Sequence, residues 1–160
     1  MSTLGRRGRW PAALICGLTL TGCTIGPSAT AARPPAPAPA PVVGVSMVDH
    51  RFELDRPVPA GRVVFQITND GQSAHDLIML PLAEDVPPIA EQLRGSERRL
   101  VQPYAGIYER PPGDTGTFAV NLLPGQRYAM ICIVVGEDGE PHWMKGMATE
   151  FRTPGPAATS

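Results

Sequence analysis

The chain has 160 residues, which is enough for one domain of ordinary size with appended segments rather than for two domains. Its 19 prolines and 17 glycines, set against 6% aromatic residues, predict many turns and short strands and argue against a helical bundle. The formal net charge is -1, so the sequence lacks the excess of basic residues that nucleic-acid binding requires.

The N-terminal segment, residues 1–22, has the organisation of an export signal. Three arginines precede an apolar run over residues 10–20, which is too short to span a bilayer. The run ends in Leu20-Thr21-Gly22-Cys23, which resembles the bacterial lipobox, where the chain is cut before the cysteine and the cysteine receives a lipid. The resemblance implies a lipoprotein signal peptide, a lipid on Cys23, and an exported, periplasmic protein anchored to the cell membrane or the outer membrane. An ordinary secretory signal cut near residues 29–32 is the alternative.

Residues 23–41 are rich in alanine and proline. Such a segment buries little apolar surface and favours extended polyproline II, so we expect a semi-rigid linker that holds a domain away from a membrane. Residues 153–160 have a similar composition and are expected to form a flexible tail. The folded domain is therefore predicted over residues 42–152.

Short runs of β-branched and alternating apolar residues occur throughout the predicted domain, and glycine, proline, asparagine and aspartate separate them. Their spacing predicts an all-β fold, an antiparallel sandwich. The predicted strands cover residues 43–48, 52–54, 63–68, 75–80, 116–122, 126–134 and 146–152.

Residues 81–112 interrupt this pattern. They hold too many prolines and charged residues for a strand, so we expect a long excursion between two strands, with one or two helical turns over residues 89–93. The side chains expected to pack this segment over the sandwich are Ile89, Leu93, Tyr104 and Tyr108.

The chain has three cysteines, and only one of them lies in the predicted domain. Cys16 lies in the apolar run of the signal, and Cys23 is the expected site of lipidation. Cys132 is left without a partner in an oxidising compartment, so it is a buried inert thiol, a reactive thiol or a metal ligand.

Two of the three histidines lie where they could join Cys132 as metal ligands. His75 follows a turn and opens a predicted strand, and His142 follows the loop after Cys132. Two imidazoles and a thiolate, with a weak axial thioether, form the ligand set of a blue copper electron-transfer site. The third histidine, His50, is expected to be a structural or solvent-exposed residue.

Two methionines are candidates for the axial thioether. Met144 lies two residues after His142, and Met147 lies five residues after it. Two residues leave little chain for a side chain to reach back beneath the metal, so the spacing favours Met147.

The order and spacing of these residues resemble the plastocyanin and azurin type of cupredoxin. The resembling motifs are Asn69-x-Gly71 before His75, Tyr128-x-x-x-Cys132, and His142-x-x-x-x-Met147 followed by Glu150-Phe151. The resemblance covers residues 43–152 and implies a cupredoxin-like Greek-key β-sandwich with one long loop or short-helix insertion. It also implies one type 1 copper ion, with His75, Cys132 and His142 as equatorial ligands, Met147 as axial ligand, and a partly exposed His142 as the route for electrons. The nine residues between Cys132 and His142 form a longer loop than small electron carriers of this type have.

These features together predict an electron carrier rather than an enzyme. The sequence holds no nucleophile elbow and no glycine-rich phosphate loop. The expected partners are a redox protein and, through the lipid, a membrane; no nucleic-acid partner is expected. Two alternatives stay open: a copper carrier or scavenger without redox turnover, and a metal-free interaction domain of the same fold.

Overall fold

The computed structural model describes residues 38–95, 99 and 102–156. The predicted signal peptide over residues 1–22, Cys23 and most of the predicted linker lie outside these residues, as do residues 157–160. Among the described residues, no helix has the length and apolar character needed to cross a membrane.

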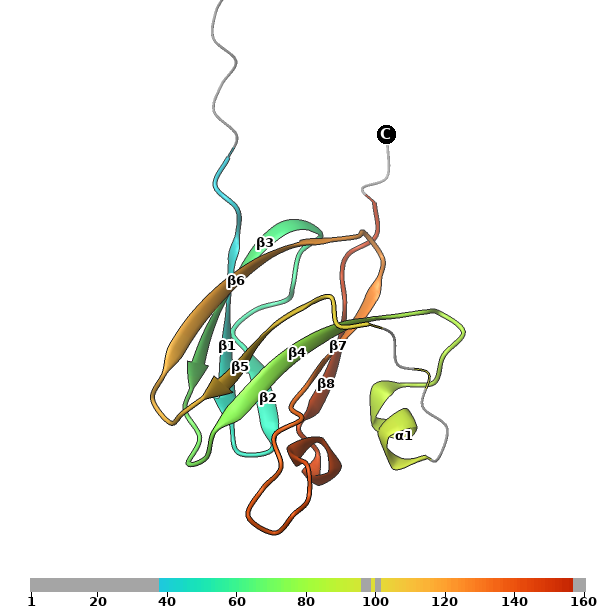
Figure 1. Ribbon diagram of the computed structural model, residues 1–160. Coiled ribbons are helices and arrows are strands. Elements are labelled where there is room, and N and C mark those ends of the chain that lie inside the picture. The colour runs from blue at the N-terminus through green and yellow to red at the C-terminus, as the bar shows by residue number, and fades with distance from the viewer. Residues whose placement is uncertain (1–37, 96–98, 100–101, 157–160) are drawn as a thin grey trace, which may run out of the picture. The chain divides into compact units, whose positions relative to one another are not determined.

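Two four-stranded sheets face each other and enclose the core (Figure 1). The first sheet has the strand order β2-β1-β3-β6, and the second has the order β5-β4-β7-β8. The strands are β1 (Val42–Val48), β2 (Arg51–Leu54), β3 (Gly61–Asn69), β4 (His75–Leu82), β5 (Ala105–Arg110), β6 (Thr115–Leu122), β7 (Arg127–Ile131) and β8 (Ala148–Arg152). The all-β cupredoxin-like sandwich predicted from the sequence is confirmed.

One pairing differs from the antiparallel prediction. Strands β1 and β3 pair in parallel, whereas the other five neighbouring pairs are antiparallel. The reason is the path of the chain: β2 returns beside β1 through a tight turn, and β3 then reverses again and pairs with the opposite edge of β1. A strand that follows two reversals runs in the direction of the first strand.

The core forms between the sheets because alternate residues of each strand face inward. In β1 the inward residues are Val43, Val45 and Met47, and in β3 they are Val63, Phe65 and Ile67, all of them buried. Complete burial of such side chains is worth about 1.5–3 kcal/mol each relative to exposure. The buried core therefore fixes the positions of the strand ends.

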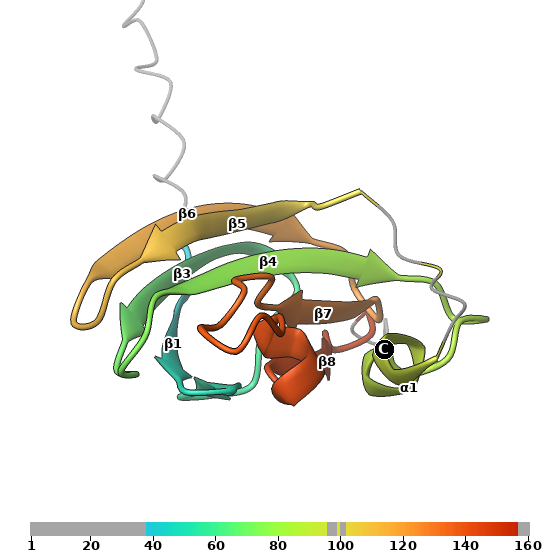
Figure 2. The same ribbon diagram turned by 60° about the horizontal axis from the view of Figure 1, so that its bottom comes forward.

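The outer face of the second sheet is covered as well. Helix α1 (Ile89–Arg94) lies beside the second sheet (Figure 2). Its side chains Ile89 and Leu93 belong to one buried apolar cluster with Leu80 of β4 and its neighbours. This confirms the predicted helical turns and the packing of those two side chains. It also explains why β4 is apolar along most of its length: both of its faces are buried.

The two tyrosines of residues 81–112 differ from each other. Tyr108 is 53% exposed, so the expectation that it packs over the sandwich was wrong. Tyr104 is 47% exposed, and its ring stacks on the buried Tyr128 at 6.2 Å between centroids, so the expected packing is found for this tyrosine. Its hydroxyl donates a hydrogen bond to the carbonyl oxygen of Asn121 at 2.5 Å.

The expectation of no strand within residues 81–112 was wrong for β5, which pairs with β4 at the edge of the second sheet. The alternation of buried and exposed residues along β5 is weak for two reasons. The register with β4 shifts between His75 and Leu77, and Glu109 has a left-handed backbone with φ 50°. Gly106 lies so close to β4 that an added Cβ would come within 2.5 Å of the Leu77 carbonyl oxygen. Sequence periodicity does not reveal such a close approach.

The folded part also continues beyond the predicted boundary at residue 152. Thr153 is buried, and its hydroxyl donates a hydrogen bond to the carbonyl oxygen of Leu123 at 2.6 Å. The backbone N–H of Gly125 donates to the carbonyl oxygen of Pro154 at 2.9 Å. The first residues after β8 are therefore held against the turn between β6 and β7.

Candidate metal centre

Three of the predicted ligands meet at one end of the sandwich, the lower end in Figure 1. His75 is the first residue of β4, and Cys132 directly follows β7, which is the neighbour of β4 in the second sheet. His142 opens a short 3-10 helix, η1 (His142–Lys145), which the sequence analysis did not predict. The ligand atoms of the three residues all lie within 4.8 Å of one another, and all three side chains are buried.

The distances between the ligand atoms suit a single metal ion. Cys132 Sγ lies 3.6 Å from His142 Nδ1 and 3.9 Å from His75 Nδ1. Three ligands bound in a trigonal plane, with bonds of about 2.0–2.3 Å, would be spaced by roughly 3.5–4 Å. The two Nδ1 atoms are somewhat closer, at 3.0 Å. The residues present therefore fit a small, thiophilic ion with little movement of the side chains.

The loop that carries the later ligands is fastened to Cys132 by backbone hydrogen bonds. The N–H of Trp143 donates to the Cys132 carbonyl oxygen at 3.0 Å, and the N–H of Cys132 donates to the Met147 carbonyl oxygen at 3.1 Å. The N–H of Met147 in turn donates to the carbonyl oxygen of His142 at 3.0 Å. Although the loop is long, its end is closed tightly around the cysteine.

The structure separates the two methionine candidates. Met147 is fully buried in the same apolar cluster as Cys132, whereas Met144 is 57% exposed. Gly146, between them, has a left-handed backbone with φ 103°, which ends η1 and turns the chain back toward the core. The burial and the backbone contacts therefore favour Met147 as the axial ligand.

His142 is more enclosed than the resemblance implied. Only 3% of its surface is exposed, and the ring of His50 lies edge-on to it at 5.5 Å between centroids. Burial lowers the pKa of His142, and the neighbouring His75 and His50 lower it further. The neutral imidazole, which is the form that binds a metal, is thereby favoured.

The thiol of Cys132 is not an activated nucleophile. Burial raises its pKa, although the backbone N–H of Asp76 donates a hydrogen bond to Sγ at 3.3 Å. A reactive cysteine needs a lowered pKa and access to solvent, and Cys132 has neither. Of the three roles that the sequence left open for this residue, the geometry favours that of metal ligand, since a bound ion displaces the thiol proton.

The segment before His75 is shaped by Asn69, which is fully buried. Its side-chain amide donates hydrogen bonds to the carbonyl oxygens of Ser73 at 2.8 Å and Arg110 at 2.7 Å. Its side-chain oxygen accepts one from the N–H of Gly71 at 2.9 Å. Three bonds from one side chain therefore fix the turn that leads into β4.

The turn between β1 and β2 consists of Asp49, which sequence reasoning missed, and His50, which is exposed as expected but also contacts the site. Asp49 accepts a hydrogen bond from His75 Nε2 at 3.1 Å, and His50 covers His142. Burial raises the pKa of Asp49, but hydrogen bonds from Gln72 and His75 outweigh this and lower it. The signal available in the sequence was a polar two-residue turn between two strands of alternating apolar residues, which predicts a tight hairpin at this position.

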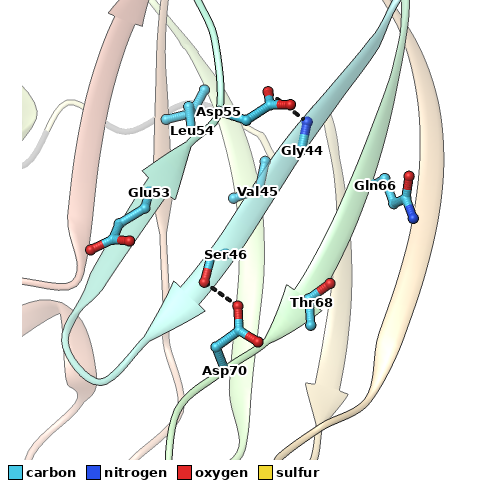
Figure 3. A pocket seen from close by; sticks show the side chains of 9 residues that line it. All are labelled: Gly44, Val45, Ser46, Glu53, Leu54, Asp55, Gln66, Thr68 and Asp70. Carbon is cyan, nitrogen blue, oxygen red and sulfur yellow. Dashed lines mark hydrogen bonds between the residues drawn. The ribbon is translucent and has the colours of Figure 1, made fainter.

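A separate hollow lies on the open face of the first sheet, over β1, β2 and β3 (Figure 3). Its carboxylates already have partners within the fold: Asp55 accepts a hydrogen bond from the N–H of Gly44, and Asp70 accepts one from the hydroxyl of Ser46. None of the three clustered ligands lines this hollow.

A β-sandwich that gathers two histidines and a cysteine at one end, with a buried methionine beside them, has the architecture of a cupredoxin, and this chain has the cupredoxin fold. It is similar to a dithionite-reduced auracyanin from the photosynthetic bacterium Roseiflexus castenholzii, with 16% identity, a TM-score of 0.50, and coverage of 72% of this chain and 98% of that chain. It is also similar to auracyanin B, with 17% identity, a TM-score of 0.51, and coverage of 74% of this chain and 91% of that chain. No family model and no curated protein matches the sequence.

Proposed function

We propose that the protein binds one type 1 copper ion through His75, Cys132 and His142, with Met147 as the axial ligand, and that it carries electrons. The observation that carries this proposal is the convergence of two imidazole nitrogens and one thiol, all buried, within 4.8 Å of one another. Two imidazoles with one thiolate are the equatorial ligands of blue copper centres. When bound there, copper supplies a one-electron couple between Cu(II) and Cu(I).

The contribution of the protein is a rigid, dry ligand set. His75 and Cys132 sit at the ends of paired strands, where the core fixes their positions. The backbone N–H of Asp76 points at the sulfur, which balances part of a thiolate charge. Since the thiolate and thioether suit Cu(I) while the imidazoles tolerate both oxidation states, the same arrangement holds either with little rearrangement.

A copper titration tests the proposal directly. Addition of Cu(II) to the purified protein is expected to produce an intense visible thiolate-to-copper band that saturates at one equivalent. Reversible voltammetry of the loaded protein then separates an electron carrier from a copper carrier without redox turnover. Absence of the band at saturating copper would contradict the proposal and favour the metal-free interaction domain.

The axial ligand is tested by Met147→Leu. Leucine preserves the apolar volume but lacks the sulfur, so we expect copper to bind and the reduction potential to rise, because a weak donor to the ion is lost. Cyclic voltammetry measures the change. The matched control is Met144→Leu, which makes the same substitution at an exposed position three residues away and is expected to leave the potential unchanged. If Met144→Leu alone moves the potential, the axial assignment belongs to Met144.

We further propose that the protein is exported and attached to a membrane by a lipid on Cys23, and that its partner is a redox protein at that membrane. The support is the sequence Leu20-Thr21-Gly22-Cys23 after a short apolar run, followed by a proline-rich linker. A tether of this kind raises the effective concentration of the domain for a membrane-bound partner.

Mass spectrometry of the mature N terminus tests the attachment. A diacylglyceryl-modified Cys23 is expected for the wild-type chain, and Cys23→Ser is expected to lose the modification and leave the membrane fraction. Cys16→Ser, within the segment that is removed, is the control and is expected to keep both. An unmodified N terminus near residues 29–32 would instead support an ordinary secretory signal.

A further inference from the structure

The turn between β1 and β2 reaches over the metal-ligand end of the sandwich. Val48 pairs with Arg51, which leaves Asp49 and His50 as the two turn residues, and His50 adopts the left-handed backbone conformation with φ 65°. This geometry sets the Asp49 carboxylate against the ring edge of His75 that faces away from Cys132.

The contact between Asp49 and His75 is built into the fold. The backbone N–H of Gln72 donates to both carboxylate oxygens of Asp49, at 3.0 and 3.1 Å, and the hydroxyl of Ser73 donates to one of them at 3.3 Å. A Cβ on Gly71 would come within 2.7 Å of both His75 Nε2 and Asp49 Oδ1, so only glycine leaves room for the pair. The His75 side chain is fully buried, whereas that of Asp49 is 35% exposed.

The chemistry of the two groups assigns the proton. An ionised carboxylate can only accept hydrogen bonds, so the proton in this contact is on His75 Nε2. In the neutral imidazole, the form that binds a metal, the lone pair is then on Nδ1, and Nδ1 is the atom that faces Cys132 and His142. A carboxylate behind a metal-binding histidine both orients the ring and makes its free nitrogen a stronger donor.

We propose that Asp49 is a positioning residue that holds His75 in the Nε2-protonated tautomer and, by its negative charge, favours oxidised over reduced copper at the site. This inference rests on the proposed copper function for its second half, whereas the tautomer can be observed in the metal-free protein. A negative charge next to a ligand stabilises Cu(II) more than Cu(I), since the oxidised ion carries one more positive charge.

The first test uses the metal-free protein and nitrogen-15 NMR of the imidazole rings. The wild-type spectrum is expected to show His75 protonated at Nε2, and Asp49→Ala is expected to shift ring protons toward Nδ1. Predominant protonation of His75 at Nδ1 in the wild-type protein would overturn the inference, whatever the protein does with copper.

The second test compares reduction potentials of the copper-loaded protein. Asp49→Asn keeps an oxygen that can accept the hydrogen bond but removes the charge, so the preference for Cu(II) over Cu(I) is expected to fall about tenfold or more. For a one-electron couple, tenfold corresponds to a rise of about 59 mV. Asp70→Asn is the matched control, since it removes the same charge from an exposed residue that bonds to Ser46 rather than to a histidine.

The outcomes separate the two proposals. A potential that rises in Asp49→Asn but not in Asp70→Asn supports the role of Asp49. Equal potentials in both variants and the wild type overturn it while leaving the copper site intact. If the wild-type protein gives no visible band with Cu(II), the copper function fails, and the NMR measurement alone decides the role of Asp49 in orienting His75.

Discussion

Replacement of Cys132 by serine is expected to abolish the visible thiolate-to-copper band completely. The band requires electron donation from a thiolate to Cu(II), and Cys132 is the one cysteine within the residues that the structure describes. A serine hydroxyl in the same buried position stays protonated and offers a hard oxygen, which suits copper poorly. Absorption spectroscopy after addition of one equivalent of Cu(II) measures the loss.

The matched control for this substitution is Cys23→Ser, which makes the same chemical change outside the domain. That variant should keep the full band, because it retains Cys132, the cysteine that lies beside His75 and His142 in the described part of the chain. Circular dichroism should show that both variants remain folded. A band that survives in Cys132→Ser and disappears in Cys23→Ser would mean that the thiolate ligand had been assigned to the wrong cysteine.

Asn69→Ala is expected to lower the free energy of unfolding by about 2–3 kcal/mol. The substitution leaves the carbonyl oxygens of Ser73 and Arg110 and the N–H of Gly71 without their hydrogen-bond partner. Alanine can replace none of the three bonds that the side chain makes. Urea denaturation, monitored by circular dichroism, measures the change in the unfolding midpoint. The loss of order at His75 is also expected to weaken Cu(II) binding.

The control is Asn121→Ala, which truncates an exposed asparagine on β6. Surface substitutions of this kind usually change stability by less than about 0.5 kcal/mol. If both asparagine variants unfold at the same urea concentration, the stability of the turn before His75 does not depend on the Asn69 side chain.

The three clustered residues of the site could be predicted from the sequence more completely than the residues that contact them. His75, Cys132 and His142 could be found because each type is scarce and because their order and spacing resemble the cupredoxin motifs. The alternating patterns of β1 and β3 predicted those strands because one face of each is buried. The helical turns over residues 89–93 were also predicted, and they correspond to helix α1.

The features that sequence reasoning missed depend on contacts between distant segments. Strand β5 has a weak pattern because it lies at an edge and its register shifts, so its identity depends on pairing with β4. His142 contacts His50, which lies 92 residues earlier in the sequence, and the contact of Asp49 with His75 is made by the same turn. The local sequence of the turn does not determine which histidine each turn residue contacts, because these contacts depend on the fold of the whole domain.

Strand β1 has a consequence for how the domain meets other molecules. It begins at Val42, immediately after the proline-rich segment, and ends at the turn that touches the two histidine ligands. Its 7 residues at a rise of about 3.3 Å each separate these two points by roughly 20 Å. A contact made with the described domain at the start of β1 is therefore made at the opposite end of this strand from the turn that touches the two histidines.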